Sequence, residues 1–307
     1  DKVVTFTVYS GESFRGAVWR LHDAGVLRAP EFFNLYAVLR GDTQRVKAGT
    51  YQVVRDQSPR ELLDNFVTGD SLLTVLTVPE GFNLHDVAQR VEAMGLGQAK
   101  LFLELATSPE FIAKFDLPLP EGVSTLEGFL FPETYYVHKG VGEAALIRSM
   151  VREFFKRVIP TLRQKSADVG LSPYEVLTLA SVVEKETGAE AERQLIAGVF
   201  HNRLRTGMRL DSDPTVIYGV ENFNGNLTRA HLRARTDYNT YKVHGLPPTP
   251  IANPGLEAIL ATLQPADVPY LFFVAKGDGT HHFSKDLRSH NRAVYKYQKL
   301  PHRRGKS

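Results

Sequence analysis

The chain has 307 residues, 43% hydrophobic and 23% charged, which is ordinary for a globular protein and enough for two domains with separate cores. Its formal net charge of +3 is too small to indicate a nucleic-acid partner and fits an acidic polymer only loosely. The absence of cysteine excludes disulfides, thiol nucleophiles and thiolate metal sites. No stretch approaches the roughly 20 apolar residues that span a bilayer, and no signal peptide is visible.

The first seventy residues predict a strand, two helices, a second strand and a third helix. The β-branched, alternating segments Val3–Val8 and Gly49–Val54 are typical of strands. Ser13 is the expected N-cap of the first helix, and Pro30–Leu39 is the second. Ser58, which precedes Pro59, is the expected cap of the third helix.

The strand–turn–helix pattern then recurs about 70 residues later. Leu73–Val78 predicts a strand, Gly81 a turn and Asn83–Met94 a helix. Further helices are expected at Lys100–Phe115, Glu143–Lys165, Glu190–Leu204 and Asp286–Gln298, and a further strand at Tyr270–Ala275. The chain is therefore expected to have an α+β fold in which helices dominate the middle.

The helix that begins at Ser172 ends in an unusual group of charges. Ser172 and Glu175 form a predicted capping box with Pro173 at the first helical position. Val176–Val183 is apolar on nearly all sides, which predicts a buried helix. It runs directly into Glu184-Lys185-Glu186.

A carboxyl group at the edge of an apolar site is what a general acid needs near neutral pH, because burial raises its pKa. The alternative is that the helix simply emerges into solvent. Successive helical residues are about 100° apart, so Glu184 and Glu186 are expected to point to roughly opposite sides. Only one of them would then face a cleft, and the other would be solvated or paired, for instance with Arg193.

Three other clusters have competing interpretations. Asp211–Thr215 could bind a metal, but Asp before Pro favours a structural turn. Tyr238–Tyr241 and Gly245–Gly255 carry aromatic, amide and hydroxyl groups that suit sugars, or else form a rigid surface loop. The histidines near His281 lack metal-helix spacing and there is no nucleophile elbow, so a hydrogen-bonding role at a cleft edge is favoured. No metal and no cofactor are expected.

Long motifs in the second half of the chain, and one before it, resemble the YceG-like endolytic murein transglycosylases. The resemblance covers nearly the whole chain, and the motifs occur in the order that they have in that family. They are Leu126–Tyr135, Leu179–Thr187, Val199–Leu204, Gly207–Leu210, Asp213–Gly219, Tyr238–Tyr241, Gly245–Pro248, Asn253–Gly255 and Gly279–Asn291. One departure is Asp211, where a neutral residue is expected.

The resemblance implies a LysM-like module at residues 1–72 and a catalytic transglycosylase domain at 73–307. It implies cleavage of the MurNAc–GlcNAc bond of nascent glycan strands, which leaves 1,6-anhydroMurNAc ends. A single N-terminal anchor in the bacterial inner membrane, absent from this chain, would hold the catalytic part in the periplasm. The expected partners are peptidoglycan glycan strands and cell-wall synthases (penicillin-binding proteins), and no nucleic acid.

The resemblance also implies which residues act. Related enzymes place one catalytic acid before a hydroxyl residue, and the pair Glu186-Thr187 is similar. Glu186 is therefore the predicted catalytic residue, with Glu184 as second choice. The predicted substrate-binding residues are Tyr218, Asn239 and Tyr241, followed by Glu127 and His281.

Three alternatives remain open from the sequence. A lysozyme-like hydrolase would share the substrate but release reducing MurNAc ends. A non-catalytic peptidoglycan-binding scaffold would depend on the LysM-like module alone. A pyridoxal-phosphate lyase using Lys185 is disfavoured because no phosphate-cradling loop is present.

Overall fold

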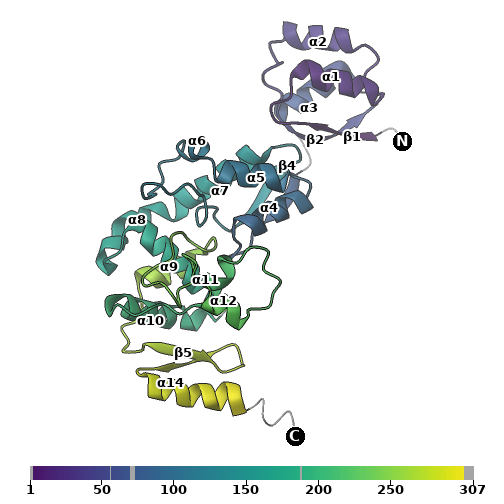
Figure 1. The fold of residues 1–307 in the computed structure, drawn as a ribbon. Helices are drawn as coiled ribbons and strands as arrows, with labels where there is room; N and C mark the ends of the chain where they lie inside the picture. Colours follow the sequence, from purple (N-terminus) through teal and green to yellow (C-terminus); the bar gives the residue numbers. More distant parts are fainter. Residues whose placement is uncertain (1–2, 56, 70–72, 187–188, 301–307) are drawn as a thin grey trace. The chain divides into compact units, whose positions relative to one another are not determined.

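The computed structural model describes residues 3–55, 57–69, 73–186 and 189–300 (Figure 1). Helices and three two-stranded antiparallel sheets make up these residues, so the α+β class is confirmed. The chain separates into two compact units. The first contains Asp1–Val78, His85–Leu105 and Glu133–Ser149, and the second contains Pro79–Leu84, Ala106–Pro132 and Met150–Ser307.

The first unit begins with the predicted series of elements. Strand β1 (Val3–Val8) pairs antiparallel with β2 (Gly49–Val54), and helices α1 (Phe14–Asp23) and α2 (Pro30–Leu39) lie between them in the chain. Helix α3 (Pro59–Thr68) follows. The predicted caps are present. The Ser13 hydroxyl accepts the Gly16 amide at 3.1 Å, and Ser58 forms a capping box with Glu61.

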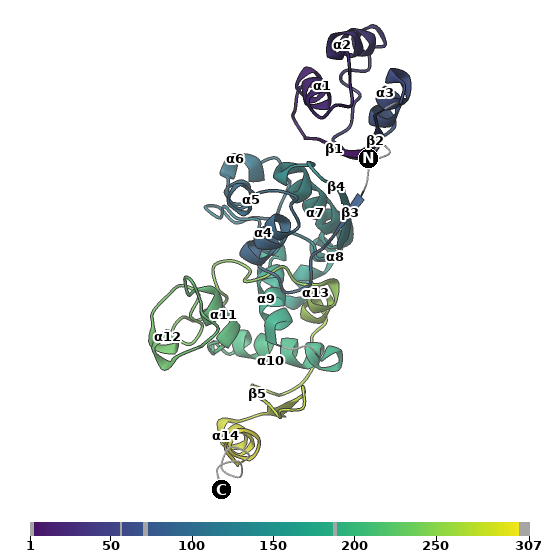
Figure 2. The same ribbon diagram turned by 90° about the vertical axis from the view of Figure 1, so that its right-hand side faces the viewer.

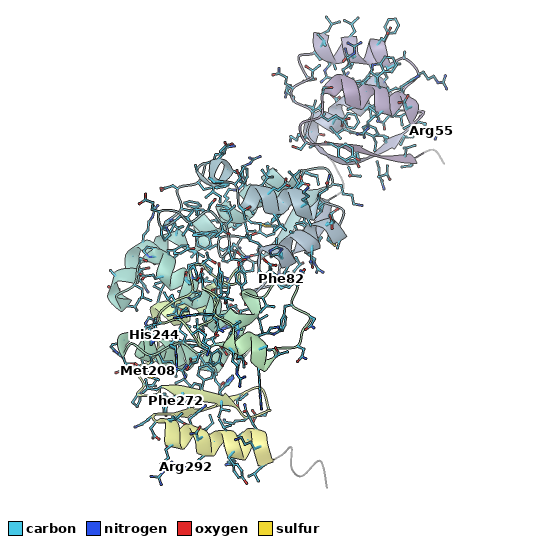
Figure 3. The ribbon with its side chains drawn as sticks, in the orientation of Figure 1. Arg55, Phe82, Met208, His244, Phe272 and Arg292 are labelled. Carbon is cyan, nitrogen blue, oxygen red and sulfur yellow. The ribbon has the colours of Figure 1, made fainter. Side chains whose placement is uncertain are left out.

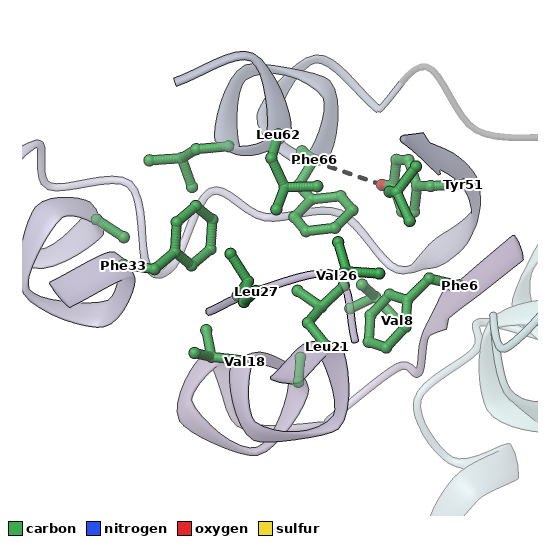
Figure 4. Close-up of a cluster of buried hydrophobic side chains, with 14 residues drawn as sticks. Phe6, Val8, Val18, Leu21, Val26, Leu27, Phe33, Tyr51, Leu62 and Phe66 are labelled. Carbon is green, nitrogen blue, oxygen red and sulfur yellow. Dashed lines mark hydrogen bonds between the residues drawn. The ribbon is translucent and has the colours of Figure 1, made fainter. Parts of the chain in front are cut away.

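These elements enclose a core of their own (Figure 4). The Phe66 ring on α3 lies 6.2 Å from the Phe6 ring and 4.7 Å from the Tyr51 ring, centroid to centroid. Burial raises the pKa of Tyr51 to about 12, and its hydroxyl donates to the Lys47 carbonyl at 2.6 Å. Aromatic packing of this kind contributes beyond the area it buries. The sheet is therefore held by side chains from α1 and α3.

Strand β3 (Leu73–Thr77) pairs antiparallel with β4 (Thr134–His138). The sequence analysis assigned no strand to β4, because its partner lies about sixty residues earlier and the pairing is not a local property. Helix α4 (Leu84–Ala93) follows β3 through Gly81, whose φ is 75°. A second left-handed glycine, Gly11 with φ 79°, lies at the equivalent position between β1 and α1. The repeated strand–turn–helix pattern is therefore confirmed.

Proline divides two segments that were each predicted as one continuous helical region. Lys100–Phe115 forms α5 (Ala99–Ala106) and α6 (Pro109–Ile112), and Glu143–Lys165 forms α7 (Glu143–Arg157) and α8 (Ile159–Lys165). Pro lacks the amide that an uninterrupted helix requires, so each new helix starts beside it.

The second unit is built around the buried helix α9 (Pro173–Glu186), and helix α13 (Leu256–Leu263) packs along it (Figure 2). Helix α10 (Arg193–Arg205) also contacts both of them. The predicted burial of Val176–Val183 is confirmed, since every residue from 176 to 183 is at most 1% exposed. Apolar side chains on all sides of α9 therefore meet neighbouring elements and no solvent.

The C-terminal part carries short elements that the sequence analysis only partly predicted. Strand β5 (Phe272–Ala275) pairs antiparallel with β6 (His281–Ser284), and α14 (Leu287–Val294) continues into the π-helical turn Tyr295–Lys299. Both strands contact α14 (Figure 1). Helices α11 (Asp213–Tyr218), α12 (Arg229–Arg233) and α13, and strand β6, were not predicted, because each is at most eight residues long.

Among the residues that the structure describes, no helix has both the length and the hydrophobicity to cross a membrane.

Truncation of Phe66 should destabilise the N-terminal elements selectively. Phe66 is 1% exposed and Phe32, on the outer side of α2, is 76% exposed, so the two Phe→Ala variants form a matched pair. Phe66→Ala should lower the free energy of unfolding by about 3–5 kcal/mol, and Phe32→Ala by less than about 0.5 kcal/mol. The single tryptophan, Trp19 on α1, reports this transition by fluorescence during urea denaturation. Equal midpoints for the two variants would contradict the assigned core.

Candidate active site

The two acids at the end of α9 have different partners, as their helical spacing predicts. The Oε1 atom of Glu186 accepts a hydrogen bond from the Ser212 hydroxyl at 2.5 Å. The Oε2 atom of Glu184 accepts one from the Gly255 amide at 3.0 Å. Neither carboxylate projects freely into solvent, so the interpretation that the helix simply emerges there is wrong. Thr187, the hydroxyl residue of the predicted pair, lies outside the described residues.

The surroundings of Glu186 raise the pKa of its carboxyl group. Burial is the largest cause, and the negative charge of Asp213 acts in the same direction. The hydrogen bond from Ser212 and the charges of His281 and Arg203 act in the opposite direction without cancelling the rise. A carboxyl group in this setting retains its proton at a higher pH than an exposed glutamate does, as a general acid requires.

Ser212 is held in place by buried hydroxyl groups. Its amide donates to the Thr240 hydroxyl at 3.0 Å, and the Thr215 hydroxyl donates to its carbonyl at 2.7 Å. The hydroxyl oxygens of Thr215 and Thr240 are 2.8 Å apart. All three residues are at most 1% exposed. The hydroxyl that contacts Glu186 is therefore presented by a rigid network.

The acids on either side of Ser212 differ in their surroundings. Asp213 is an exposed residue at the first position of α11, and its Oδ1 atom accepts the Tyr241 hydroxyl at 2.9 Å. Asp211 has a left-handed backbone with φ 47° and lies 3.7 Å from Arg209. The predicted turn at this point is present, and it leads directly into a helix at Asp213.

His281 approaches from strand β6 and is paired with an acid. Its Nδ1 atom lies 2.7 Å from Oε2 of Glu192, and its amide donates to both carboxylate oxygens of Glu192 at 3.0 Å. The imidazole is thus fixed in orientation, and its charge lowers the pKa of Glu186. This arrangement fits the predicted hydrogen-bonding role, not a metal site.

Residues 201–203 of α10 hydrogen-bond to the backbone of residues 262–271, which lead into strand β5. The His201 ring nitrogen Nε2 bonds the Thr262 carbonyl at 2.8 Å, and the Asn202 amide donates to the carbonyls of residues 268 and 270. The Arg203 guanidinium donates to the Leu271 carbonyl at 2.7 Å and lies 5.4 Å from the ring centroid of Phe272. Phe272 is the first residue of strand β5 (Figure 3). Arg203 also bonds the Leu210 carbonyl at 2.5 Å, so it joins the segment that carries Ser212 to strand β5.

Glu184 has a mainly structural environment. It caps the N-terminus of α13 through the Gly255 amide, and Arg193 is among the charges that lower its pKa, although burial raises that pKa overall. A Cβ atom at Gly255 would lie 1.9 Å from Oε1 of Glu80, so a larger residue here would displace the Glu80 side chain. The neighbouring Lys185 donates to the Gly81 carbonyl at 3.1 Å.

Glu127 and Tyr218, both predicted substrate-binding residues, contact each other. The Tyr218 hydroxyl donates to Oε2 of Glu127 at 2.9 Å, and the Leu84 amide donates to the same atom at 3.0 Å. Glu127 is fully buried. The Tyr218 ring lies 4.9 Å from the Tyr238 ring, at an interplanar angle of 58°. Tyr218 is thereby the partly exposed end of a buried polar network.

The buried side chains of Asn239 and Asn253 each hydrogen-bond to backbone groups of other segments. The Asn239 side-chain amide donates to the carbonyls of residues 231, 232 and 234, and its oxygen accepts the Tyr241 amide at 3.0 Å. Asn253 donates to the Phe82 carbonyl and accepts the Leu130 amide, both at 2.9 Å. Both residues are fully buried. Because the Asn239 side chain is buried, it can affect sugar binding only by ordering the loop around it, and not by the direct sugar contact that was predicted.

The structure assembles the predicted residues into two groups. Glu186 and Tyr241 contact the Ser212–Asp213 turn, and His281 acts on Glu186 through its charge. Glu127 and Tyr218 form the second group. Sequence analysis missed Ser212, Asp213 and Arg203 as groups that act on Glu186, and Glu192 as the partner of His281. The signal was available for the first three, because Arg203 and Asp213 lie in family motifs and Ser212 precedes one.

The described part of the chain contains no group of three or more His, Asp or Glu residues that could hold a metal ion. A groove of about 760 Å³ lies beside α2 and the start of α3, and none of the predicted site residues line it.

Removal of the Ser212 hydroxyl should raise the pKa of Glu186 further, because the hydrogen bond stabilises the ionised form. Ser212→Ala should move the titration midpoint of the Glu186 carboxyl upward by roughly one pH unit, and Ser212→Thr should keep it near the wild-type value. Carboxyl ¹³C NMR of glutamate-labelled protein measures this, with Glu186→Gln to assign the signal. A downward shift in Ser212→Ala would contradict the assigned contact.

Comparison with known proteins places this arrangement in a family. The family model described as "YceG-like family" matches residues 6–296. An endolytic murein transglycosylase of Bacillus subtilis is 29% identical over 96% of this chain and 84% of its own length. One of Streptococcus pneumoniae is 30% identical over 95% of this chain, which spans 58% of that relative. A crystal structure of a putative YceG-like protein from Listeria monocytogenes is 31% identical, covers 94% of this chain and 98% of its own, and has a TM-score of 0.66. The chain therefore belongs to the YceG-like family.

Proposed function

We propose that this protein is an endolytic lytic transglycosylase that cleaves the MurNAc–GlcNAc bond of peptidoglycan, with Glu186 as its only acid–base catalyst. The observation that carries the proposal is the partly buried Glu186 carboxyl at the end of α9, held by Ser212 in a setting that raises its pKa. The curated relatives are named for this activity.

The reaction needs one proton donor that becomes an acceptor. Protonated Glu186 donates to the glycosidic oxygen as the bond between that oxygen and C1 of MurNAc breaks, through a transition state of oxocarbenium character. The Glu186 carboxylate then takes the proton from the C6 hydroxyl of the same MurNAc as its oxygen attacks C1. The products are a GlcNAc 4-hydroxyl and a 1,6-anhydroMurNAc end, with Glu186 protonated again.

The choice of Glu186 over Glu184 rests on their contacts. The Glu184 carboxylate accepts the amide at the start of α13, which a helix N-terminus favours in the ionised state. The Glu186 carboxyl accepts a hydrogen bond from the Ser212 side-chain hydroxyl. Another donor or acceptor can replace this hydroxyl without breaking a helix N-terminal contact. Both pKa values are raised by burial, so the direction of the shift alone does not discriminate between them.

In this proposal the remaining predicted residues position the sugar. Tyr218 and Tyr241 offer partly exposed aromatic rings with oriented hydroxyls, and ring faces stack on the C–H surfaces of sugars. His281 presents a fixed imidazole. Glu127 supports Tyr218, and Asn239 orders the segment that carries Tyr241.

We further propose that residues 1–72 form a LysM-like module and residues 73–307 the catalytic domain. The β–α–α–β order of β1, α1, α2 and β2, with a core of its own, supports the module. Members of this family act on the cell wall, so we place the activity outside the cytoplasm. An N-terminal inner-membrane anchor, a periplasmic catalytic part and association with cell-wall synthases complete the proposal.

Replacement of the catalytic carboxyl should abolish activity. We expect Glu186→Gln to yield no detectable anhydro-muropeptides from purified sacculi, and the matched variant Glu184→Gln to retain at least about a third of the wild-type rate. Mass spectrometry of the released ends measures both. If Glu186→Gln is active and Glu184→Gln is not, the acid is Glu184. Reducing MurNAc ends would identify a hydrolase, and an inert wild-type protein would identify a binding scaffold.

Glu186→Gln should also be more stable than the wild type at neutral pH. Because the folded-state pKa of Glu186 is raised, the folded protein binds more protons than the unfolded chain between the two pKa values, and its stability falls as pH rises through that window. The stability gap between the variants should therefore be absent below about pH 4 and open above it. Urea denaturation at several pH values measures the gap; a constant gap would contradict the raised pKa.

A further inference from the structure

The turn that holds Glu186 carries a second acid for which the mechanism above has no use. Asp213 follows Ser212 directly, and Ser212 is hydrogen-bonded to the Glu186 carboxyl at 2.5 Å. The Asp213 residue is exposed, yet Tyr241 fixes its carboxylate through a 2.9 Å hydrogen bond. An exposed acid at the start of a short helix does not need such a partner for stability.

We propose that Asp213, oriented by Tyr241, is the electrostatic positioning partner of Glu186 and keeps the proton on that residue in the free enzyme. This inference rests on the proposed role of Glu186 as the general acid. Asp213 acts through Glu186 and exchanges no proton itself. It accepts the Tyr241 hydroxyl, and that hydroxyl remains protonated because burial and the Asp213 charge both raise the pKa of Tyr241.

The charges around Glu186 explain why such a partner is needed. Arg203 from α10 and His281 from β6 both lower the pKa of Glu186, and the Ser212 hydrogen bond lowers it as well. Arg203 and His281 also have structural contacts: the Arg203 guanidinium donates to the Leu271 and Leu210 carbonyls, and the His281 ring bonds Glu192. Among the charged groups that act on Glu186, Asp213 opposes them, together with burial.

The rigidity of the turn sets the geometry of the pair. Thr240 bonds the Ser212 amide, and its two neighbours take part as well: Asn239 orders the loop and Tyr241 bonds Asp213. One three-residue segment therefore positions both the hydroxyl that contacts Glu186 and the charge beside it. This gives the Tyr238–Tyr241 motif a role in acid–base tuning in addition to any sugar contact.

The test compares the titration of Glu186 in charge variants by carboxyl ¹³C NMR without substrate. Asp213→Asn should lower the midpoint by roughly one pH unit, the size of one charge–charge interaction near a protein surface. Tyr241→Phe keeps the Asp213 charge but removes the hydrogen bond that orients the Asp213 carboxylate, so it should lower the midpoint by a smaller amount. Asp211→Asn is the matched control: it removes the same charge two residues earlier, where Asn tolerates φ 47°, and should move the midpoint by less than about a third as much.

Activity supplies a second readout that a merely structural role would not move. In Asp213→Asn the alkaline limb of anhydro-end formation should shift to lower pH with the NMR midpoint, giving a loss of about tenfold above that midpoint and little loss well below it. A uniform loss at all pH values, or an unchanged NMR midpoint, would overturn the inference. Should Asp213→Asn fail to fold by circular dichroism, the NMR midpoint of Tyr241→Phe decides: an unchanged midpoint would overturn the inference.

The two proposals fail in different ways. An active Glu186→Gln variant would remove Glu186 as the acid, whereas the NMR comparison of Asp213→Asn with Asp211→Asn tests the charge coupling without any substrate.

Discussion

The site depends on the partial burial of one carboxyl group at the end of a helix whose middle is apolar on nearly every side. No residue from Val176 to Val183 is more than 1% exposed, and the final turn carries Glu186 into surroundings that raise the pKa of its carboxyl group. Ser212, Arg203 and His281 approach from other elements and partly stabilise the charged form. The balance of these opposing effects leaves the pKa of Glu186 above its ordinary value.

Much of the polar sequence serves to place those neighbours. Asn202 and Arg203 bind the backbone that leads into strand β5, whose partner β6 begins with His281. Asn239 and Thr240 order the segment facing Ser212. These side chains are buried and satisfy backbone groups that would otherwise be unpaired. Several residues of the family motifs thus bring separate segments of the chain together around one acid.

The N-terminal elements follow different physics. Strands β1 and β2 form a sheet too small to be stable alone, and it is completed by aromatic packing of Phe66 against Phe6 and Tyr51. This core is independent of the polar networks around Glu186. The packing of the N-terminal core and the contacts of Glu186 therefore depend on different residues.

Local sequence determined the elements whose cause is local. Ser13, Ser58 and Ser172 marked helix starts because a side-chain oxygen caps the next turn. The mostly apolar run Val176–Val183 marked a buried helix that ends in acidic residues. Helical spacing alone also separated Glu184 from Glu186. Tertiary structure decided what each acid meets: Glu184 the start of α13, and Glu186 the turn at Ser212. It also decided the pairing of β4 and the contact of Tyr241 with Asp213. These contacts join residues between 26 and 71 positions apart, and no local pattern encodes which distant segment closes on which.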